Sequence, residues 1–480
     1  MTAIEYSSKA KEVLNDGELQ SVLPREFLYG AASASFQIEG GAHLDNKSSS
    51  VWDTWTRTMP FSGEQACDSY HRFRDDVALL KQYGFNSYRF SLSWPRILPH
   101  GKAGSPVNQA GMKYYSDLID ALLEAGITPV VTLFHWDLPQ CLADEYDGFR
   151  SHRDIIRDFS AYARICFEYL GDRVKHWITI NEPQIFTLFN GVALLKDSWR
   201  PIQDYAIFAR SLILCHAHAY RLYKAEFAAQ QKGIIGITLN CDWVEPFDES
   251  EKSISGAQLR LDWNLSLFAD PIYLGRCNET MQHELGEYKL NFTPDDWQVV
   301  AHSSDFTCWT DGERVPSEGA HAFIIGFGCT NQIFEKDGKP LGTTGHMGHP
   351  VDAPWGFRKL LRYVNERYIR DTGMAIMVTE NGMSVANEAQ ASRVDQINDV
   401  VRQEYYAGYI RELVQAVRDD GILISGYMAW SLLDNLEWVW GYEPRYGLTI
   451  VDHENAFRRI PKHSAYLLRD IFRQVIRRSD

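Results

Sequence analysis

The sequence predicts the α/β class and, within it, a single-domain (β/α)8 barrel (TIM barrel) with long loops at the C-terminal face of the strands. First, an amphipathic helical pattern, a glycine and a short apolar stretch follow one another repeatedly along the 480 residues. Helices that alternate with short buried strands are typical of a parallel sheet covered by helices. Second, eight strand candidates can be counted, as a closed barrel requires. Third, no GxGxxG or GxxxxGK(S/T) motif opens a helix, which disfavours the alternative, a doubly wound open sheet.

The helix–glycine–strand repeat is clear from its first occurrence. Residues 73, 77 and 80 are apolar at helical spacing, Gly84 follows, and an apolar stretch begins at residue 87. A glycine just past a helix supplies the left-handed residue that closes it. The same order surrounds Gly126, Gly171, Gly233, Gly373 and Gly421. The expected strands are residues 27–33, 87–94, 128–134, 174–180, 234–239, 305–310, 375–379 and 424–430.

The second expected strand shows which of its faces lines the barrel. Apolar and polar side chains alternate over residues 88–93, and Arg89 belongs to the polar set. Alternate side chains of a strand point to opposite faces of the sheet. An arginine inside the barrel is costly unless a carboxylate pairs with it. We therefore expect a buried carboxylate next to Arg89.

The chain divides into residues 1–22, a polar N-terminal extension, and residues 23–480, the barrel domain. No linker or low-complexity tract interrupts the second part, and its excess length lies chiefly in residues 260–302 and 312–354. Loops at the carboxyl ends of the strands build the site in barrels of this kind. Polar and aromatic residues do gather where the expected strands end.

The amino-acid composition restricts the kinds of molecule that the protein is expected to bind. The net charge of −15 argues against a nucleic-acid partner, which requires a basic face. The sequence has no run of eighteen apolar residues and no apolar signal-peptide core near its start, so we expect no membrane association and a cytoplasmic location. The eight cysteines are scattered without metal-ligand spacing, which favours reduced thiols and no metal site. The oligomeric state stays open.

Two glutamates end two of the expected strands. Glu182 lies in the string TINEP at residues 179–183, and Glu380 lies in VTENG at residues 378–382. Two facing carboxyl groups are what hydrolysis of a glycosidic bond requires, one as acid and one as nucleophile or base. A nearby cation such as Arg89 would keep the nucleophile ionised. The alternative is that each glutamate only caps a strand or pairs with a surface cation.

Six strings in the same order identify the chain as similar to glycoside hydrolase family 1, the retaining β-glucosidases, including a fungal-like intracellular type. They are the two glutamate motifs, ASFQIEG at 34–40, YRFSLSW at 88–94, LFHWDLP at 133–139 and WSLLDNLEW at 430–438. The resemblance implies hydrolysis of terminal non-reducing β-D-glucosyl residues from short β-glucosides such as cellobiose, without a cofactor, and with transglycosylation as a possible side reaction. The implied partner is a small-molecule β-glucoside or oligosaccharide, and the implied setting is carbohydrate metabolism, including cellulose degradation.

The resemblance also implies a role for each matching residue. Glu380 would be the nucleophile and Glu182 the acid/base. Asn181 would bind the 2-hydroxyl of the sugar, and Arg89 would form an ion pair with Glu380. Trp430 would provide an apolar platform beneath the sugar ring. The other sugar hydroxyls would be bound by Gln37, His135, Glu437 and Trp438. Packing in the core is the alternative role for Trp430 and His135. Asn240, after the fifth strand, is open between a site contact and a strand-end cap.

Two of these residues narrow the substrate class. Family members that hydrolyse 6-phosphoglycosides hold phosphate with Ser, Lys and Tyr in the loop where this chain has Glu437. A carboxylate there would repel a phosphate dianion. The thioglucosidases of the family replace the acid/base with Gln, whereas this chain keeps Glu182.

The chain departs from the family pattern in two segments. Alignment after the sixth strand puts Thr310 and Gly312 where the family has Asn and a Tyr that hydrogen-bonds the nucleophile. Residues 191–201 also lack the family's usual Gly-Tyr…Ala-Pro-Gly segment, so the aglycone preference is not inherited. Two alternatives therefore stay open: a catalytically weak sugar-binding or regulatory relative, and a β-galactosidase or broad β-glycosidase.

Overall fold

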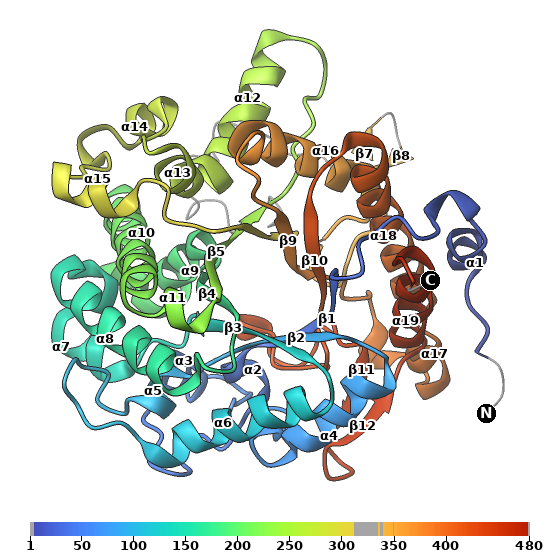
Figure 1. The fold of residues 1–480 in the computed structure, drawn as a ribbon, viewed down its shortest axis with the longest axis horizontal. Helices are drawn as coiled ribbons and strands as arrows, with labels where there is room; N and C mark the ends of the chain where they lie inside the picture. Colours follow the sequence, from blue (N-terminus) through green and yellow to red (C-terminus); the bar gives the residue numbers. More distant parts are fainter. Residues whose placement is uncertain (1–3, 312–334, 337–338, 349, 479–480) are drawn as a thin grey trace.

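Eight parallel strands close into a barrel in the computed structural model of the chain. The model describes residues 4–311, 335–336, 339–348 and 350–478. The strand order around the barrel is β1-β10-β9-β6-β5-β4-β3-β2, and Figure 1 shows helices arranged around these strands. The predicted (β/α)8 barrel is confirmed. The loop expected at residues 312–354 lies largely outside the described residues.

All eight expected strands are present, with small shifts at their ends. The strands are β1 Leu28–Ala32, β2 Ser87–Ser91, β3 Thr128–Phe134, β4 His176–Asn181, β5 Ile234–Cys241, β6 Thr307–Asp311, β9 Ile376–Asn381 and β10 Ile424–Trp430. β2 ends three residues early, at Ser91, and the short helix α5 (Trp94–Ile97) begins at the last residue expected for the strand. β4 and β9 instead continue to Asn181 and Asn381. Both glutamate motifs therefore lie at the carboxyl ends of their strands.

Long helices cover the outside of the barrel. They are α4 Ser69–Gln82, α6 Gln109–Glu124, α8 His152–Leu170, α10 Pro201–Glu226, α16 Pro354–Val364, α18 Val400–Asp420 and α19 His463–Val475. In α8, Ile155, Phe159 and Tyr162 are buried at helical spacing, so one apolar face packs inward. No helix among the described residues is long and apolar enough to cross a membrane.

Shorter elements occupy the connections. They include α2 Ser35–Ile38, α3 Val51–Thr56, α7 Gln140–Tyr146, α9 Pro183–Phe189, α12 Glu251–Leu261, α14 Glu279–Leu285, α15 Pro294–Val300, α17 Arg393–Asn398 and the pair β11 Thr449–Asp452 and β12 Arg458–Pro461. Helix α1 (Ser8–Leu14) belongs to the N-terminal extension. It packs against α18 and α19 (Figure 1) and buries Ala10 and Val13.

The glycines after the helices do not all act as the sequence suggested. Gly84 has φ +66°, as a left-handed helix end requires. Gly171 remains right-handed, with φ −73° and ψ −12°, so the expectation of a left-handed residue is wrong there. A Cβ on Gly171 would lie 2.0 Å from the side-chain oxygen of Gln231, so a larger residue there would require that side chain to move.

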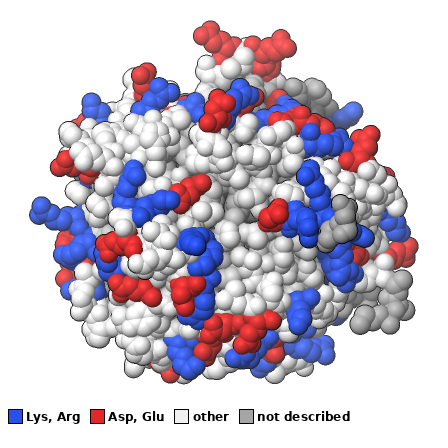
Figure 2. Space-filling view, in the orientation of Figure 1, with Lys and Arg blue, Asp and Glu red and all other residues white. Residues whose placement is uncertain are grey.

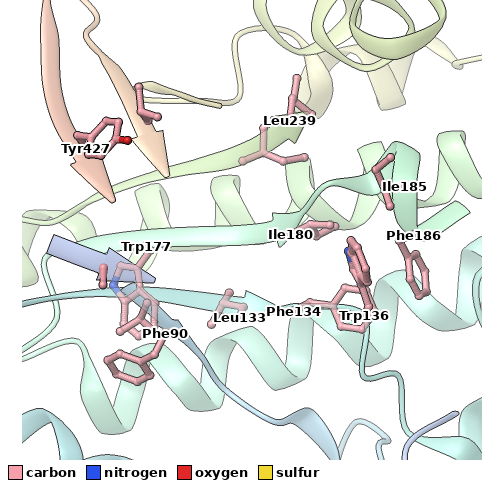
Figure 3. Close-up of a cluster of buried hydrophobic side chains, with 14 of the residues drawn as sticks. Phe90, Leu133, Phe134, Trp136, Trp177, Ile180, Ile185, Phe186, Leu239 and Tyr427 are labelled. Carbon is pink, nitrogen blue, oxygen red and sulfur yellow. The ribbon is translucent and has the colours of Figure 1, made fainter. Parts of the chain in front are cut away.

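Apolar side chains fix the ends of β3 and β4. Phe134, Trp136 and Phe186 lie close together in Figure 3, and the rings of Phe134 and Phe186 meet edge to face at 5.1 Å. These residues flank His135 and Asn181 in sequence or in space, so aromatic packing holds the strand ends that carry two predicted site residues. On the outer surface, acidic and basic side chains are interspersed over the face drawn in Figure 2.

Candidate active site

One pocket at the carboxyl ends of the strands contains both predicted glutamates. Its residues surround about 460 Å³ of space, part of which is open to solvent. Six of the predicted site residues line it, and so do five that were not predicted. The lining residues are His135, Trp136, Glu182, Pro350, Glu380, Asn381, Gly382, Trp430, Glu437, Trp438 and Tyr446. Folding therefore brings together carboxyl groups that are almost 200 residues apart in the sequence.

Unusual backbone conformations mark three lining residues. Glu182, Trp136 and Trp438 have φ values of +43°, +74° and +44°. Such values are uncommon in residues other than glycine and concentrate at functional sites. Glu182 adopts this conformation between the end of β4 and Pro183, the first residue of α9. Proline suits the first helical position, so the sequence Asn-Glu-Pro turns sharply from strand to helix.

Glu380 and Trp430 come from neighbouring strands that approach closely. β9 and β10 pair in parallel with register shifts. A Cβ on Gly382 would lie 1.8 Å from the carbonyl oxygen of Trp430, so only glycine fits there. This close contact places the segment after Glu380 directly against the strand end that carries Trp430.

Arg89 pairs with Glu380 inside the barrel, so the buried carboxylate that the alternation in β2 requires is Glu380. Its side chain is 1% exposed, and its Nη1 contacts Glu380 Oε1. Its Nη2 donates a 2.6 Å hydrogen bond to Asn181 Oδ1. Asn181 Nδ2 in turn lies 3.3 Å from Glu182 Oε2 and 3.2 Å from His135 Nε2. A continuous chain of contacts thus links the two glutamates through Arg89 and Asn181.

Burial and charge shift the pKa values of the ionisable groups in the pocket. Burial raises the pKa of Glu380, while the Arg89 guanidinium acts in the opposite direction. Burial, followed by the negative charges of Glu380 and Glu182, raises the pKa of Glu437 to about 8. Burial and Arg89 both lower the pKa of His135 well below its usual value, so its imidazole is neutral. Arg89 therefore favours the ionised form of Glu380.

Gln37 and Glu437 meet behind the pocket wall. Gln37 is fully buried, and its Nε2 donates to Leu436 O at 2.9 Å and lies 3.3 Å from Glu437 Oε2. Among the described residues, Gln37 Oε1 and His135 Nδ1 have no hydrogen-bond partner. Buried polar atoms normally find partners. His135 lines the pocket, so its Nδ1 is placed to meet a hydroxyl group of a ligand, whereas Gln37 is not among the lining residues. Trp430 lies on the other side of His135, with ring centroids 5.9 Å apart.

Asn240 contacts a neighbour of the acid/base candidate and does not line the pocket. Asn240 is buried at the end of β5 but is not among the lining residues, and its Nδ2 donates to Gln184 Oε1 at 3.1 Å. It therefore contacts helix α9 next to Glu182. The side chain of Thr310 and all of Gly312 lie outside the described residues. No group of three potential metal ligands occurs in the described part of the chain.

Comparison with known proteins assigns the family. Residues 19–476 match the model of glycosyl hydrolase family 1. The chain belongs to this family. It is 44% identical over 470 residues to beta-glucosidase 1B of Phanerodontia chrysosporium, covering 94% of this chain and 85% of that one. A beta-glucosidase from the fungus Humicola insolens, solved in complex with glucose, superposes with a TM-score of 0.90 at 37% identity, covering 96% of this chain and 100% of that one. The beta-glucosidase from Trichoderma harzianum superposes with a TM-score of 0.89 at 37% identity, covering 95% of this chain and 98% of that one.

This family 1 glycoside hydrolase has lining residues that sequence reasoning did not select. Trp136, Asn381 and Gly382 are adjacent to selected residues in the same motifs, so strand-end position alone could have indicated them. Tyr446 was missed because it follows an irregular stretch after the η12 turn (Trp438–Trp440), where no periodicity places a side chain. Its backbone carbonyl accepts from Ser431 N at 3.1 Å, which returns the chain to the pocket.

Proposed function

We propose that this hydrolase is a retaining β-glucosidase that releases terminal non-reducing β-D-glucosyl residues from short β-glucosides such as cellobiose, as in the last step of cellulose degradation. Glu380 is the nucleophile and Glu182 the acid/base. The observation that carries this proposal is the presence of both carboxyl groups in one pocket, connected through Arg89 and Asn181. The relatives named beta-glucosidases support the choice of glucosides.

The first chemical step forms a covalent intermediate. The Glu380 carboxylate attacks the anomeric carbon, and the bond from that carbon to the leaving oxygen breaks. Glu182 transfers its proton to that oxygen, so the aglycone leaves as a neutral alcohol. Arg89 favours the charged form of Glu380 that this attack requires.

The second step releases the sugar with its original anomeric configuration. Glu182, now a carboxylate, removes a proton from water, and the water oxygen attacks the anomeric carbon. The ester bond to Glu380 breaks and both side chains return to their starting states. A second sugar in place of water would give transglycosylation.

The remaining site residues bind the sugar. The unpartnered Gln37 Oε1 accepts a hydrogen bond from one hydroxyl group, and His135 Nδ1 donates to another, since its Nε2 faces the amide donor of Asn181. Glu437 binds further hydroxyls, and Asn181 binds the 2-hydroxyl. The indole of Trp430 packs against the apolar face of the ring.

The charges favour unphosphorylated substrates. Glu182, Glu380 and Glu437 all line the pocket, and no Lys or Arg is among the described lining residues. A phosphate dianion would therefore meet acidic groups without a compensating cation. The retained Glu182 favours O-glycosides over thioglucosides. We further propose a cytoplasmic location, since Cys67, Cys141, Cys166, Cys215 and Cys277 are free thiols, as is usual in a reducing compartment.

Turnover of 4-nitrophenyl β-D-glucoside and cellobiose by the purified protein tests the proposal. We expect hydrolysis by the wild type, β-glucose as the first product in NMR, and loss of turnover in Glu380→Ala. Glu366→Ala is the matched control, because Glu366 is exposed and pairs only at the surface with Arg370. Undiminished activity of Glu380→Ala would refute the assigned nucleophile. Glucose binding without turnover would indicate a binding protein, and faster galactoside hydrolysis would indicate a β-galactosidase.

A further inference from the structure

Five buried charged side chains lie beneath the loop that carries Glu437. They form an ionic cluster made of Glu388, Asp399, Arg402, Asp434 and Lys462. The side chains of Arg402 and Lys462 are 0% exposed, and the most exposed carboxylate, that of Asp434, is 9% exposed. Burying this many charges is expensive, and apolar packing would often be at least as stable. The cluster therefore calls for an explanation beyond stability.

Lys462 connects the cluster to both ends of the Glu437 loop. Its Nζ lies 2.6 Å from Glu388 Oε1 and 2.9 Å from Asp434 Oδ1. The same Asp434 oxygen accepts a 2.8 Å hydrogen bond from Gly447 N. Asp434 precedes Glu437 by three residues and Gly447 directly follows Tyr446. One carboxylate held by Lys462 thus joins the beginning and the end of the segment 434–447.

Arg402 connects the same cluster to the segment after the nucleophile. Its Nε donates to the carbonyl oxygen of Met383 at 3.2 Å, and Met383 directly follows Gly382 of the pocket. Its Nη2 donates to the carbonyl oxygen of Arg445 at 2.7 Å, next to Tyr446. Arg402 also pairs with Glu388 and Asp399. A single guanidinium therefore holds backbone on both sides of the pocket.

The charges in the cluster are strongly coupled. Burial alone would raise the pKa of Glu388, but Arg402 and Lys462 outweigh it and hold that pKa at about 2. Glu388 is thus a carboxylate bridging two cations that come from α18 and from the residue before α19. Loss of either cation would leave buried carboxylates without compensation.

We propose that Lys462 and Arg402 are positioning residues for sugar binding, which fix the segment 434–447 against the end of β9 so that Glu437 and Trp438 stay in the pocket with Glu380. The inference rests on the proposed function for the identity of the sugar. A positioning role differs from a purely structural role in one testable respect. If Lys462 is lost, Glu437 should no longer contribute to sugar binding, because the segment 434–447 would no longer hold that side chain in the pocket.

A double-mutant cycle on ligand binding tests this coupling. The probe is 4-nitrophenyl 1-thio-β-D-glucoside, measured by calorimetry, so the result does not depend on turnover. In the wild type, Glu437→Ala should weaken binding about 100-fold, because the sugar hydroxyls that it binds would be left buried without a partner. In the Lys462→Met background the same change should cost less than about 5-fold, since contacts already lost cannot be lost again. Lys462→Arg should restore much of the wild-type response.

The control is Arg367→Met, which removes the cation paired with the buried Asp270 at 2.7 Å, away from the pocket. In this background Glu437→Ala should keep its full effect. If Lys462→Met does not fold, Asp434→Asn replaces it, because it removes charge but keeps the acceptor for Gly447 N. An equal effect of Glu437→Ala in all backgrounds would overturn the inference. If the cycle shows the coupling but the wild type does not hydrolyse aryl glucosides, the proposed function alone is refuted. If the wild type does not bind the thioglucoside, both the proposed function and this inference are refuted.

Discussion

Arg89→Met is the substitution whose effect the structure predicts most fully. The guanidinium is buried, contacts Glu380 and hydrogen-bonds Asn181. Its removal leaves burial unopposed, so the pKa of Glu380 rises further and less of the nucleophile is ionised at neutral pH. The acidic limb of the pH profile of kcat/KM should therefore move to higher pH.

The size of the effect follows from the attraction between the two charges. Unit charges about 4 Å apart at an effective dielectric constant of about 20 attract by about 4 kcal/mol. A loss of this size in the transition state lowers the rate by about 10³-fold. The assay is hydrolysis of 4-nitrophenyl β-D-glucoside between about pH 4 and pH 9, a range that covers both limbs of a typical profile.

A second buried arginine provides the control. Arg459 pairs with Asp76 at 2.9 Å, and their side chains are 6% and 4% exposed. Arg459→Met should cost a similar amount of stability, about 3–5 kcal/mol, but it should leave the pH profile in place. An Arg89→Met enzyme with the wild-type acidic limb and kcat/KM within about tenfold of the wild type would refute the reasoning.

Three further changes test other parts of the site. Glu437→Gln should raise the free energy of unfolding by a few kcal/mol at about pH 7.5 and far less at about pH 4, measured by denaturant titration. The pKa of Glu437 in the folded protein, about 8, lies above the ordinary value of 4.5, so the stability of the wild type falls as pH rises between these two values. A stability difference between variant and wild type that does not change with pH would contradict this reasoning. Gly382→Ala should prevent folding, because its Cβ would lie 1.8 Å from Trp430 O, whereas Gly17→Ala, with open space around it, should melt like the wild type. Glu182→Gln should slow cellobiose hydrolysis far more than that of a dinitrophenyl glucoside, whose leaving group needs no proton; equal losses would argue against Glu182 as the acid.

Local periodicity was sufficient for the barrel. β3 and β10 begin and end at the predicted residues, because continuous apolar stretches are bounded by clear breaks. The strand alternation required a carboxylate partner for Arg89, and the family resemblance named that partner as Glu380, which Arg89 contacts. Position at a strand end and residue chemistry together placed both glutamates in one pocket.

Features created by long-range contacts could not be predicted in this way. Gly171 does end a helix, but its right-handed conformation and the approach of the Gln231 side chain, which lies 60 residues later, leave no trace in the local sequence pattern. The positions of Tyr446 and of the ionic cluster around Lys462 depend on how irregular loops return to the barrel. No periodic pattern in the sequence predicts the course of these loops. Asn240 shows the same limit, because its contact with Gln184 is decided by the geometry between β5 and α9.

Covalent trapping identifies the nucleophile most directly. A 2-deoxy-2-fluoro-β-glucoside with a dinitrophenolate leaving group should inactivate the enzyme, because the fluorine slows release of the sugar more than its attachment. Peptide mapping by mass spectrometry should then find one fluoroglucosyl group on Glu380, with Glu182 and Glu437 unmodified. A label on another residue, or turnover without any trapped intermediate, would contradict the assignment of Glu380 as the group that attacks the sugar.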